Sequence, residues 1–252
     1  MDTLHISLLQ SELIWEDAQA NLNLFDKKIN NLEPTDLIIL PEMFCSGFSM
    51  NVRRIAQKMD GIAMRWLSQK AQELKVALVG SLAIEESGRY YNRLIWMFPN
   101  GHYQYYDKKH LFTMANEQLT YTAGTTKLII QYKNWKIFPL ICYDLRFPIW
   151  NRNVQNYYDL AIYVANWPQK RVAHWKALSL ARAIENQAYV VAVNRVGTDA
   201  KGFYYSGDSR VIDPAGTILF EQADKEVSAQ LRLSKKELEA IRQRLPFLHD
   251  GG

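Results

Sequence analysis

Residues 137–148 have the sequence IFPLICYDLRFP. The five apolar residues at the start of this stretch predict a buried strand, and the polar residues after Cys142 predict a turn. The thiol of Cys142 would therefore stand at the carboxyl end of a strand, where α/β folds place their functional sites. On the cysteine alone two interpretations stay open: a nucleophile on a sharp turn, or a small apolar side chain packed in the core.

The remainder of the chain alternates short apolar runs with longer amphipathic stretches, which is typical of sheets covered by helices. We expect buried strands at residues 4–9, 36–40, 76–83, 159–164 and 189–194. We expect helices at residues 15–31, 62–74, 174–187 and 234–245. The capping-box spacing of Ser234 and Glu237 opens the last helix. The order strand, helix, strand from residue 159 to residue 194 indicates a parallel crossover, and the predicted fold class is α/β.

Two turn sequences indicate β-hairpins. Residues 93–106 and 209–220 each place a turn, PNG at 99–101 and DPAG at 213–216, between two apolar runs. The Asn-Gly pair of the first turn supplies the positive φ angles that a tight hairpin requires. We therefore expect antiparallel pairs to flank the parallel units.

Length and composition favour one large domain, and the predicted domain is residues 1–252. The chain of 252 residues is 48% hydrophobic, which is enough apolar material for a sizeable core. Its 30 basic and 26 acidic residues give a net charge of +4 and are dispersed along the chain. Nucleic-acid binding usually requires a concentrated basic patch, so we expect no nucleic-acid partner.

The only cysteines are Cys45 and Cys142, too few for a disulfide framework or a cysteine zinc site. A reducing compartment fits this usage best. The first six residues, MDTLHI, show neither a basic segment nor an apolar segment of a secretory leader. No stretch approaches the roughly 18 apolar residues that indicate a membrane span. We expect a cytoplasmic protein without a membrane partner.

A catalytic thiol needs a base or a cationic neighbour, because only a few per cent of an ordinary thiol is ionised near neutral pH. Among the histidines, His110 and His174 are possible partners. Glu42 directly follows the apolar run 37–41 and can serve as a general base, or it can be an ordinary surface or N-cap carboxylate. Lys108 and Lys109 follow an aromatic strand; one of them can stabilise an oxyanion, although lysine pairs commonly form a solvated face.

Three segments, LPE at 40–42, YDKKHLF at 106–112 and ICYDLRFP at 141–148, resemble the signature blocks of the nitrilase, or carbon-nitrogen hydrolase, superfamily. Further segments similar to that family are NWP at 166–168, HW at 174–175, RAIENQ at 182–187 and NRVG at 194–197. The resemblance covers nearly the whole chain. It implies a four-layer α-β-β-α sandwich, which commonly forms homodimers or higher homo-oligomers through an outer helical layer.

The resemblance also implies a Glu-Lys-Cys triad, which maps to Glu42, Lys108 and Cys142. The family spacing Lys-x-His-Leu-Phe selects Lys108 rather than Lys109. A second family glutamate, seven residues before a glycine, matches Glu117 and would hold Lys108. In the implied mechanism Glu42 is the general base, Cys142 attacks an amide carbonyl, and Lys108 and the backbone N–H of Tyr143 stabilise the oxyanion. The implied chemistry needs no metal or organic cofactor.

Within the superfamily the chain is similar to bacterial omega-amidases, which deamidate 2-oxoglutaramate or 2-oxosuccinamate. Such a substrate would need an aromatic slot, for which Phe44 and Trp167 are candidates. Its carboxylate would need a cation, and Arg146 and Arg171 are candidates. The alternative is that both aromatic residues belong to the core and both arginines form structural ion pairs.

Other functions are also compatible with the sequence. Within the same chemistry these are another aliphatic amidase, including one that acts on deaminated glutathione, and an N-carbamoyl hydrolase. From a different class, the chain can be a catalytically silent module for binding or assembly, although the complete set of Glu42, Lys108 and Cys142 argues against it. A nucleotide-binding fold is disfavoured because neither Gly-x-Gly-x-x-Gly nor a P-loop follows a strand.

Overall fold

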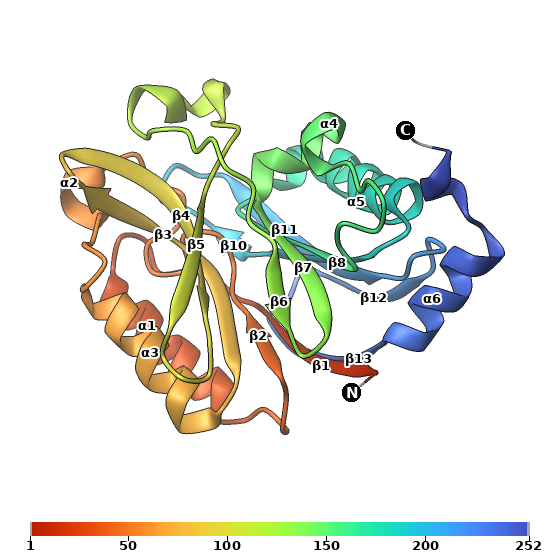
Figure 1. Cartoon of the computed structure of the whole chain (residues 1–252). Coiled ribbons are helices and arrows are strands. Elements are labelled where there is room, and N and C mark those ends of the chain that lie inside the picture. The colour runs from red at the N-terminus through yellow and green to blue at the C-terminus, as the bar shows by residue number, and fades with distance from the viewer. Residues whose placement is uncertain (1, 251–252) are drawn as a thin grey trace.

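The computed structural model describes residues 2–250 and shows two β-sheets packed face to face between outer helices (Figure 1). The first sheet has the order β13-β1-β2-β3-β4-β5. Its strands are β1 (Thr3–Gln10), β2 (Leu37–Ile39), β3 (Ala77–Glu86), β4 (Arg89–Met97), β5 (Tyr103–Asp107) and β13 (Val227–Ser234). The pairs β1–β2 and β2–β3 are parallel, and the others are antiparallel.

The second sheet has the order β10-β11-β9-β8-β7-β6, and β12 also pairs with β11. Its strands are β6 (Ile130–Tyr132), β7 (Trp135–Ile141), β8 (Leu160–Ala165), β9 (Tyr189–Asn194), β10 (Val196–Thr198), β11 (Tyr204–Ile212) and β12 (Ile218–Ala223). The strands β7, β8 and β9 run parallel, as the predicted crossover requires. The pairing of β11 with β12 is the predicted second hairpin.

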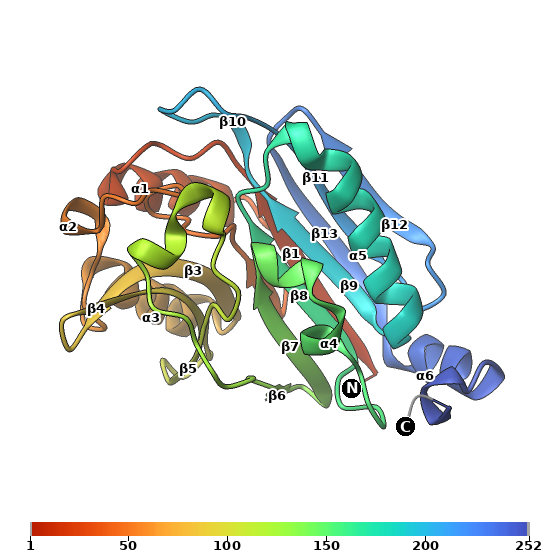
Figure 2. The same ribbon diagram turned by 90° about the horizontal axis from the view of Figure 1, so that it is seen from above.

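Helices cover the outer face of each sheet. The longer helices are α1 (Ala18–Ile29), α3 (Ile62–Leu74), α5 (Val172–Asn186) and α6 (Lys235–Arg244), and the short ones are α2 (Val52–Ile55) and α4 (Pro148–Asn151). Helices α1 and α3 lie on the first sheet, and α5 lies on the second (Figures 1 and 2). The predicted α-β-β-α sandwich is thus confirmed.

The side chains of each strand point alternately to its two faces, and this divides the core into layers. In β2, Leu37 and Ile39 pack between the two sheets, whereas Ile38 packs under α1 and α3. Successive side chains on a strand point to opposite faces, so three consecutive buried residues reach two different cores. This explains why the inner strands read as continuous apolar runs.

Element bounds depart from the predictions where local chemistry intervenes. The helix expected from residue 15 begins at Ala18, because the side chain of Asp17 accepts the N–H of Ala20 at 2.9 Å and caps it. The strand expected at 76–83 continues to Glu86 and forms a hairpin with β4 that the sequence analysis did not predict. It also missed β13, which pairs with β1.

Within the described residues 2–250, no helix combines the length and the apolar character needed to cross a membrane. The described part of the chain also contains short 3-10 helices: η1 (Thr113–Ala115), η2 (Glu117–Leu119), η3 (Cys142–Arg146), η4 (Gln169–Arg171) and η5 (Phe247–His249). The yellow-green segment with η1 and η2 and the green segment with α4 lie at the same end of the sandwich (Figures 1 and 2). The site lies at this end.

Candidate active site

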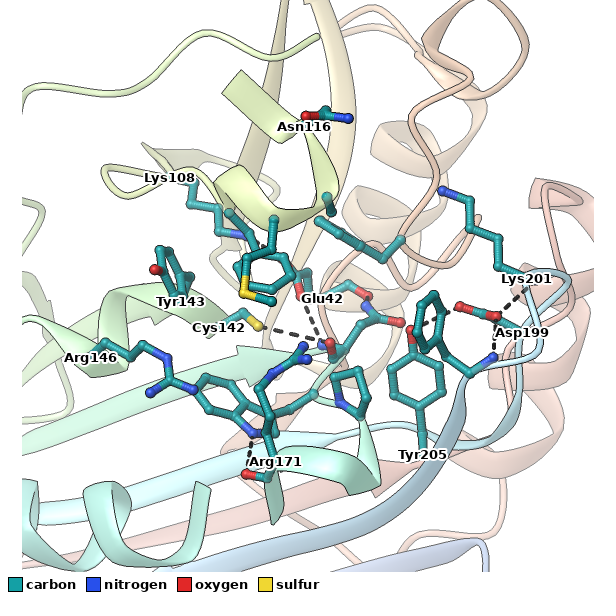
Figure 3. A pocket seen from close by; sticks show the side chains of 18 residues that line it. Glu42, Lys108, Asn116, Cys142, Tyr143, Arg146, Arg171, Asp199, Lys201 and Tyr205 are labelled. Carbon is teal, nitrogen blue, oxygen red and sulfur yellow. Dashed lines mark hydrogen bonds and ion pairs between the residues drawn. The ribbon is translucent and has the colours of Figure 1, made fainter. Parts of the chain in front are cut away.

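A cavity of about 330 Å³ opens at this end of the sandwich and is lined by residues of both sheets (Figure 3). Glu42 follows β2, Lys108 follows β5 and Cys142 follows β7, and all three line the cavity. The structure therefore brings together three residues that are spread over 100 positions of the sequence, from Glu42 to Cys142, as the resemblance implied.

Cys142 stands on a strained turn between β7 and η3. Its φ angle is 42°, in the left-handed region that a residue with a side chain rarely adopts. Asp144 holds this turn: one carboxylate oxygen accepts the N–H of Ile141 at 3.1 Å and the hydroxyl of Tyr106 at 2.8 Å. Strain of this kind, maintained by the surrounding contacts, is typical of a functional position. The turn directs Sγ toward the backbone oxygen of Asn166, 4.0 Å away.

Glu42 is fully buried and its carboxylate is held by three donors. Oε1 accepts from Nζ of Lys108 at 2.9 Å and from the amide of Asn92 at 2.8 Å. Oε2 accepts the backbone N–H of Asn166 at 2.7 Å. Asn166 also donates its side-chain amide to the backbone oxygen of Glu42 at 2.6 Å, so the end of β8 fixes the position of the glutamate.

Lys108 and Glu117 form the second half of this buried cluster. Nζ of Lys108 donates to both carboxylate oxygens of Glu117 at 3.0 Å. An ammonium has three N–H groups, and Oε1 of Glu42 and the two oxygens of Glu117 engage all three, so a further acceptor in the cavity would have to share one of them. Lys109 lies outside the cluster, with Nζ over the ring of Trp150. The structure thus places Lys108, and not Lys109, at the site.

Burial and charge set the protonation states of the cluster. Burial raises the pKa of the Cys142 thiol well above its usual value, and the negative charge of Glu42 raises it further. Burial alone would lower the pKa of Lys108, but Glu117 and Glu42 overcome this and hold it above its usual value. The cysteine is thus a thiol and the lysine an ammonium at neutral pH, so nucleophilic attack requires a base for the thiol proton.

Aromatic rings and cations form the walls of the cavity. The rings that line it belong to Phe48, Phe112, Tyr143, Trp167, Phe203 and Tyr205. Arg146 lies over the ring of Trp167, 4.9 Å from its centroid, and Arg171 lies over Phe112 at 5.0 Å. Lys201 stands on the opposite side from Arg146 (Figure 3). The cavity therefore offers cations to a small anionic ligand.

Three of the four residues predicted to bind substrate, Trp167, Arg146 and Arg171, line the cavity, but Phe44 does not. The backbone turns at Met43, where φ is 45°, and carries the Phe44 ring into the core, 5.7 Å from the ring of Phe25. The binding role predicted for Phe44 does not fit this position. Phe48, four residues later, lines the cavity in its place.

The two candidate histidines contact supporting residues. Nδ1 of His110 is 2.8 Å from Asp144, and its ring stacks on Phe147 at 3.7 Å. Nδ1 of His174 is 2.9 Å from Arg146. His110 thus braces the turn that carries Cys142, and the carboxylate beside the thiol is Glu42.

Sequence reasoning missed several residues of the site, among them Asn92, Asn166 and Lys201. Lys201 lies in a loop held by Asp199, whose carboxylate accepts the N–H groups of Lys201 and Phe203. Asn92 lies inside β4, directly before Arg93, and its position in the strand does not indicate a role. The NWP segment, already noted as family-like, was a signal for Asn166.

Comparisons with known proteins agree with this geometry. The model of the carbon-nitrogen hydrolase family matches residues 5–241. The chain is 45% identical to omega-amidase YafV of Escherichia coli K12 over 99% of its length and 97% of the relative. It is 31% identical to 2-oxoglutaramate amidase of Bacillus subtilis, with coverage of 97% and 96%. The crystal structure of XC1258 from Xanthomonas campestris, a CN-hydrolase superfamily protein with an arsenic adduct in its active site, superimposes with a TM-score of 0.98 at 41% identity, over 100% and 98% of the two chains.

Proposed function

The chain belongs to the carbon-nitrogen hydrolase family and is an amide-hydrolysing enzyme, and on this premise we propose that it is an omega-amidase. It converts the terminal amide of small 2-oxo acids, such as 2-oxoglutaramate and 2-oxosuccinamate, to a carboxylate and ammonia. The observation that carries this proposal is a buried Glu42, Lys108 and Cys142 cluster at the base of a cavity walled by cations. Similarity to omega-amidase YafV and to 2-oxoglutaramate amidase supports the substrate class.

The proposed reaction begins with attack of Sγ of Cys142 on the amide carbon, while Glu42 takes the thiol proton. The oxyanion accepts the backbone N–H of Tyr143 and an N–H of Lys108 that it shares with the glutamates. The carbon–nitrogen bond then breaks, Glu42 returns the proton to the leaving nitrogen, and ammonia departs from a thioester. Glu42 next removes a proton from water, which attacks the thioester; the acid is released and Glu42 returns the proton to the departing thiolate of Cys142. Glu117 holds Lys108 in place throughout, at 3.0 Å.

The cations of the cavity suit a substrate with a carboxylate beside its 2-oxo group. Arg146 contacts the side chains of Trp167 and His174, and Arg171 lies over Phe112, so these guanidinium groups have donors to offer a ligand. An arginine presents two parallel N–H groups to a carboxylate, which adds both energy and orientation. We propose that Arg146 and Arg171 bind the carboxylate while Trp167 packs against the carbon chain.

A single assay of ammonia release tests the substrate class. The panel contains 2-oxoglutaramate, glutamine, deaminated glutathione, a simple nitrile and an N-carbamoyl amino acid. We expect the highest kcat/KM for 2-oxoglutaramate. A higher value for another member would assign the chain to that other activity, and release from none of them would favour a silent binding module.

We further propose that the chain acts as one domain in a reducing compartment, the cytoplasm. The catalytic residues come from both sheets, Glu42 and Lys108 from the first and Cys142 from the second, so neither sheet makes a site alone. Both cysteines are free thiols, and the proposed reaction requires that Cys142 stays reduced.

We also propose a homodimer formed through α5 and the neighbouring β12. Ile184 on α5 is 47% exposed, and Ile218 and Leu219 on β12 are 44% and 43% exposed. Apolar side chains grouped in this way are typical of interfaces. Light scattering should give the mass of a dimer for the wild type and of a monomer for Ile184→Glu. Ile62→Glu on α3 is the matched control and should stay dimeric, and a monomeric wild type would refute the proposal.

A further inference from the structure

Two buried carboxylates of the site share one cation. Nζ of Lys108 lies 2.9 Å from Oε1 of Glu42 and 3.0 Å from Oε1 of Glu117, and both glutamates are fully buried. Two like charges at this separation repel in a medium that screens them weakly. A single ammonium leaves the ionised pair with a net negative charge, so another group must help to keep both glutamates ionised and in place.

The side-chain amide of Asn92 is that group. Nδ2 donates to Oε1 of Glu42 at 2.8 Å and to Oε1 of Glu117 at 3.2 Å. A primary amide has two N–H groups, so one serves each carboxylate. Asn92 is fully buried in β4 and therefore makes these contacts away from competing water. It bridges the same two oxygens as Lys108 but adds no charge.

Ser81 fixes which end of the amide faces the glutamates. Its Oγ accepts the backbone N–H of Met43 at 2.9 Å and donates to Oδ1 of Asn92 at 2.9 Å. A hydroxyl has only one hydrogen, and here that hydrogen points to Asn92. The two carboxylates can only accept, so both N–H groups of the amide face them and the amide oxygen faces Ser81. The chain of bonds starts at Met43, the residue after Glu42, and returns to Glu42.

We propose that Asn92 is a positioning residue for the hydrolysis, oriented by Ser81, and that it keeps the two glutamates ionised and Glu42 ready to accept the proton of Cys142. This inference rests on the proposed function. It also assigns the oxygen that takes the proton. Oε1 of Glu42 already accepts two donors, from Lys108 and Asn92, whereas Oε2 accepts one, from the N–H of Asn166. The thiol proton therefore goes to Oε2.

The positioning role of Asn92 can be measured on the acid side of the pH profile of kcat/KM. The other titratable groups around the two glutamates are Lys108, Cys142, Tyr121 and Tyr205, and the pKa of each lies above its usual value. Burial is the main cause for the thiol and the two phenols. For the lysine the cause is the negative charge of the two carboxylates. All four hold their protons from acidic to neutral pH. His110 and His174 are the same in wild type and variants, so a difference between their acid limbs reports the carboxylate pair that Asn92 contacts.

The test compares wild type, Asn92→Ala and Ser81→Ala. Removal of a donor makes the ionised carboxylates less favourable, so the acid limb of kcat/KM should move to higher pH by about one unit in Asn92→Ala. We expect kcat at neutral pH to fall about tenfold, with KM nearly unchanged. Ser81→Ala should shift the limb in the same direction by a smaller amount, because it only frees the amide to turn.

A matched variant separates positioning from general damage to the fold. Asn153 is also a buried asparagine, and its amide donates to the backbone oxygens of Tyr158 and Asn186 at 2.9 Å, but it contacts neither glutamate. Asn153→Ala should lower the melting temperature and leave the acid limb where it is. An equal shift in Asn153→Ala and Asn92→Ala would overturn the proposal.

A second readout distinguishes failure of this inference from failure of the proposed function. The second readout is the rate at which iodoacetamide alkylates Cys142, measured by intact mass at a series of pH values from acidic to neutral. This alkylation also requires Glu42 to take the thiol proton, but it requires no amide substrate. Should the wild type release no ammonia while Asn92→Ala shifts the alkylation profile upward, the omega-amidase proposal fails and the positioning role stands. Suppose instead that the wild type is active and that wild type and Asn92→Ala have the same pH profiles, both for kcat/KM and for alkylation. This result would overturn the positioning role of Asn92 and leave the omega-amidase proposal intact.

Discussion

The base of the cavity and its walls are built differently. At the base, Glu42, Glu117 and Lys108 are at most 1% exposed, and the carboxylate oxygens accept hydrogen bonds of 2.6 to 3.2 Å. On the walls, Arg146 and Arg171 reach the solvent side and contact aromatic rings. Buried charges are tolerated only when their hydrogen bonds are complete, whereas wall cations can exchange water for a ligand. We therefore propose that the base determines the chemistry and that the walls select the substrate.

The largest effect should follow from removal of the nucleophile at the base. Cys142→Ala should reduce ammonia release from 2-oxoglutaramate at least about 10⁴-fold, because no thioester can form. The fold should persist, since the cavity tolerates a smaller side chain at its base. Circular dichroism and the ammonia assay check both statements. Turnover retained in a folded Cys142→Ala protein would exclude the mechanism.

A smaller and selective effect should follow from a change in the wall. Arg171→Met should raise KM for 2-oxoglutaramate about 10- to 100-fold, the usual loss for a hydrogen bond to a charged group, and should leave KM for an uncharged amide unchanged. Lys170→Met is the matched control, because it removes the same charge from the neighbouring, exposed position. Equal effects of the two variants would mean that long-range charge, and not a contact, attracts the substrate.

The smallest effect on activity should follow from a change in the core behind the base. Phe44→Leu should lower the free energy of unfolding by about 1 kcal/mol, because the ring packs against Phe25 and Trp66, and should leave KM nearly unchanged. Denaturant unfolding and steady-state kinetics measure the two quantities. A raised KM with an unchanged free energy of unfolding would mean that Phe44 contacts the substrate after all.

The parts of the molecule also differ in how well they could be predicted from the sequence. Strands and helices with a clear period were predicted closely: α3 and β9 have the expected bounds. Glu42 and Cys142 could be predicted because each follows an apolar run at the end of a strand. Lys108 follows an aromatic strand, and the family resemblance selected it over Lys109. β13 was missed because it is half-exposed and its partner β1 lies at the other end of the chain.

Polar residues inside strands give no local signal of their role. Ser81 and Asn92 become informative only when β3 and β4 pair and bring them beside Glu42. Lys201 reaches the cavity because β10 and β11 pair and present the loop that Asp199 holds. Phe44 was misassigned because the turn at Met43 cannot be seen in the apolar pattern. Local pattern together with the family resemblance thus predicted the candidate reactive groups, and tertiary pairing determined which residues support them.

The central claim is that Cys142 hydrolyses a 2-oxo-acid amide through a thioester. The most direct measurement is mass spectrometry of enzyme acid-quenched at millisecond times after mixing with 2-oxoglutaramate, with peptide mapping of the modified residue. We predict a 2-oxoglutaryl group on Cys142 in the wild type and none in Cys142→Ala. An acyl group mapped to another residue, or sustained ammonia release by Cys142→Ala, would contradict the claim.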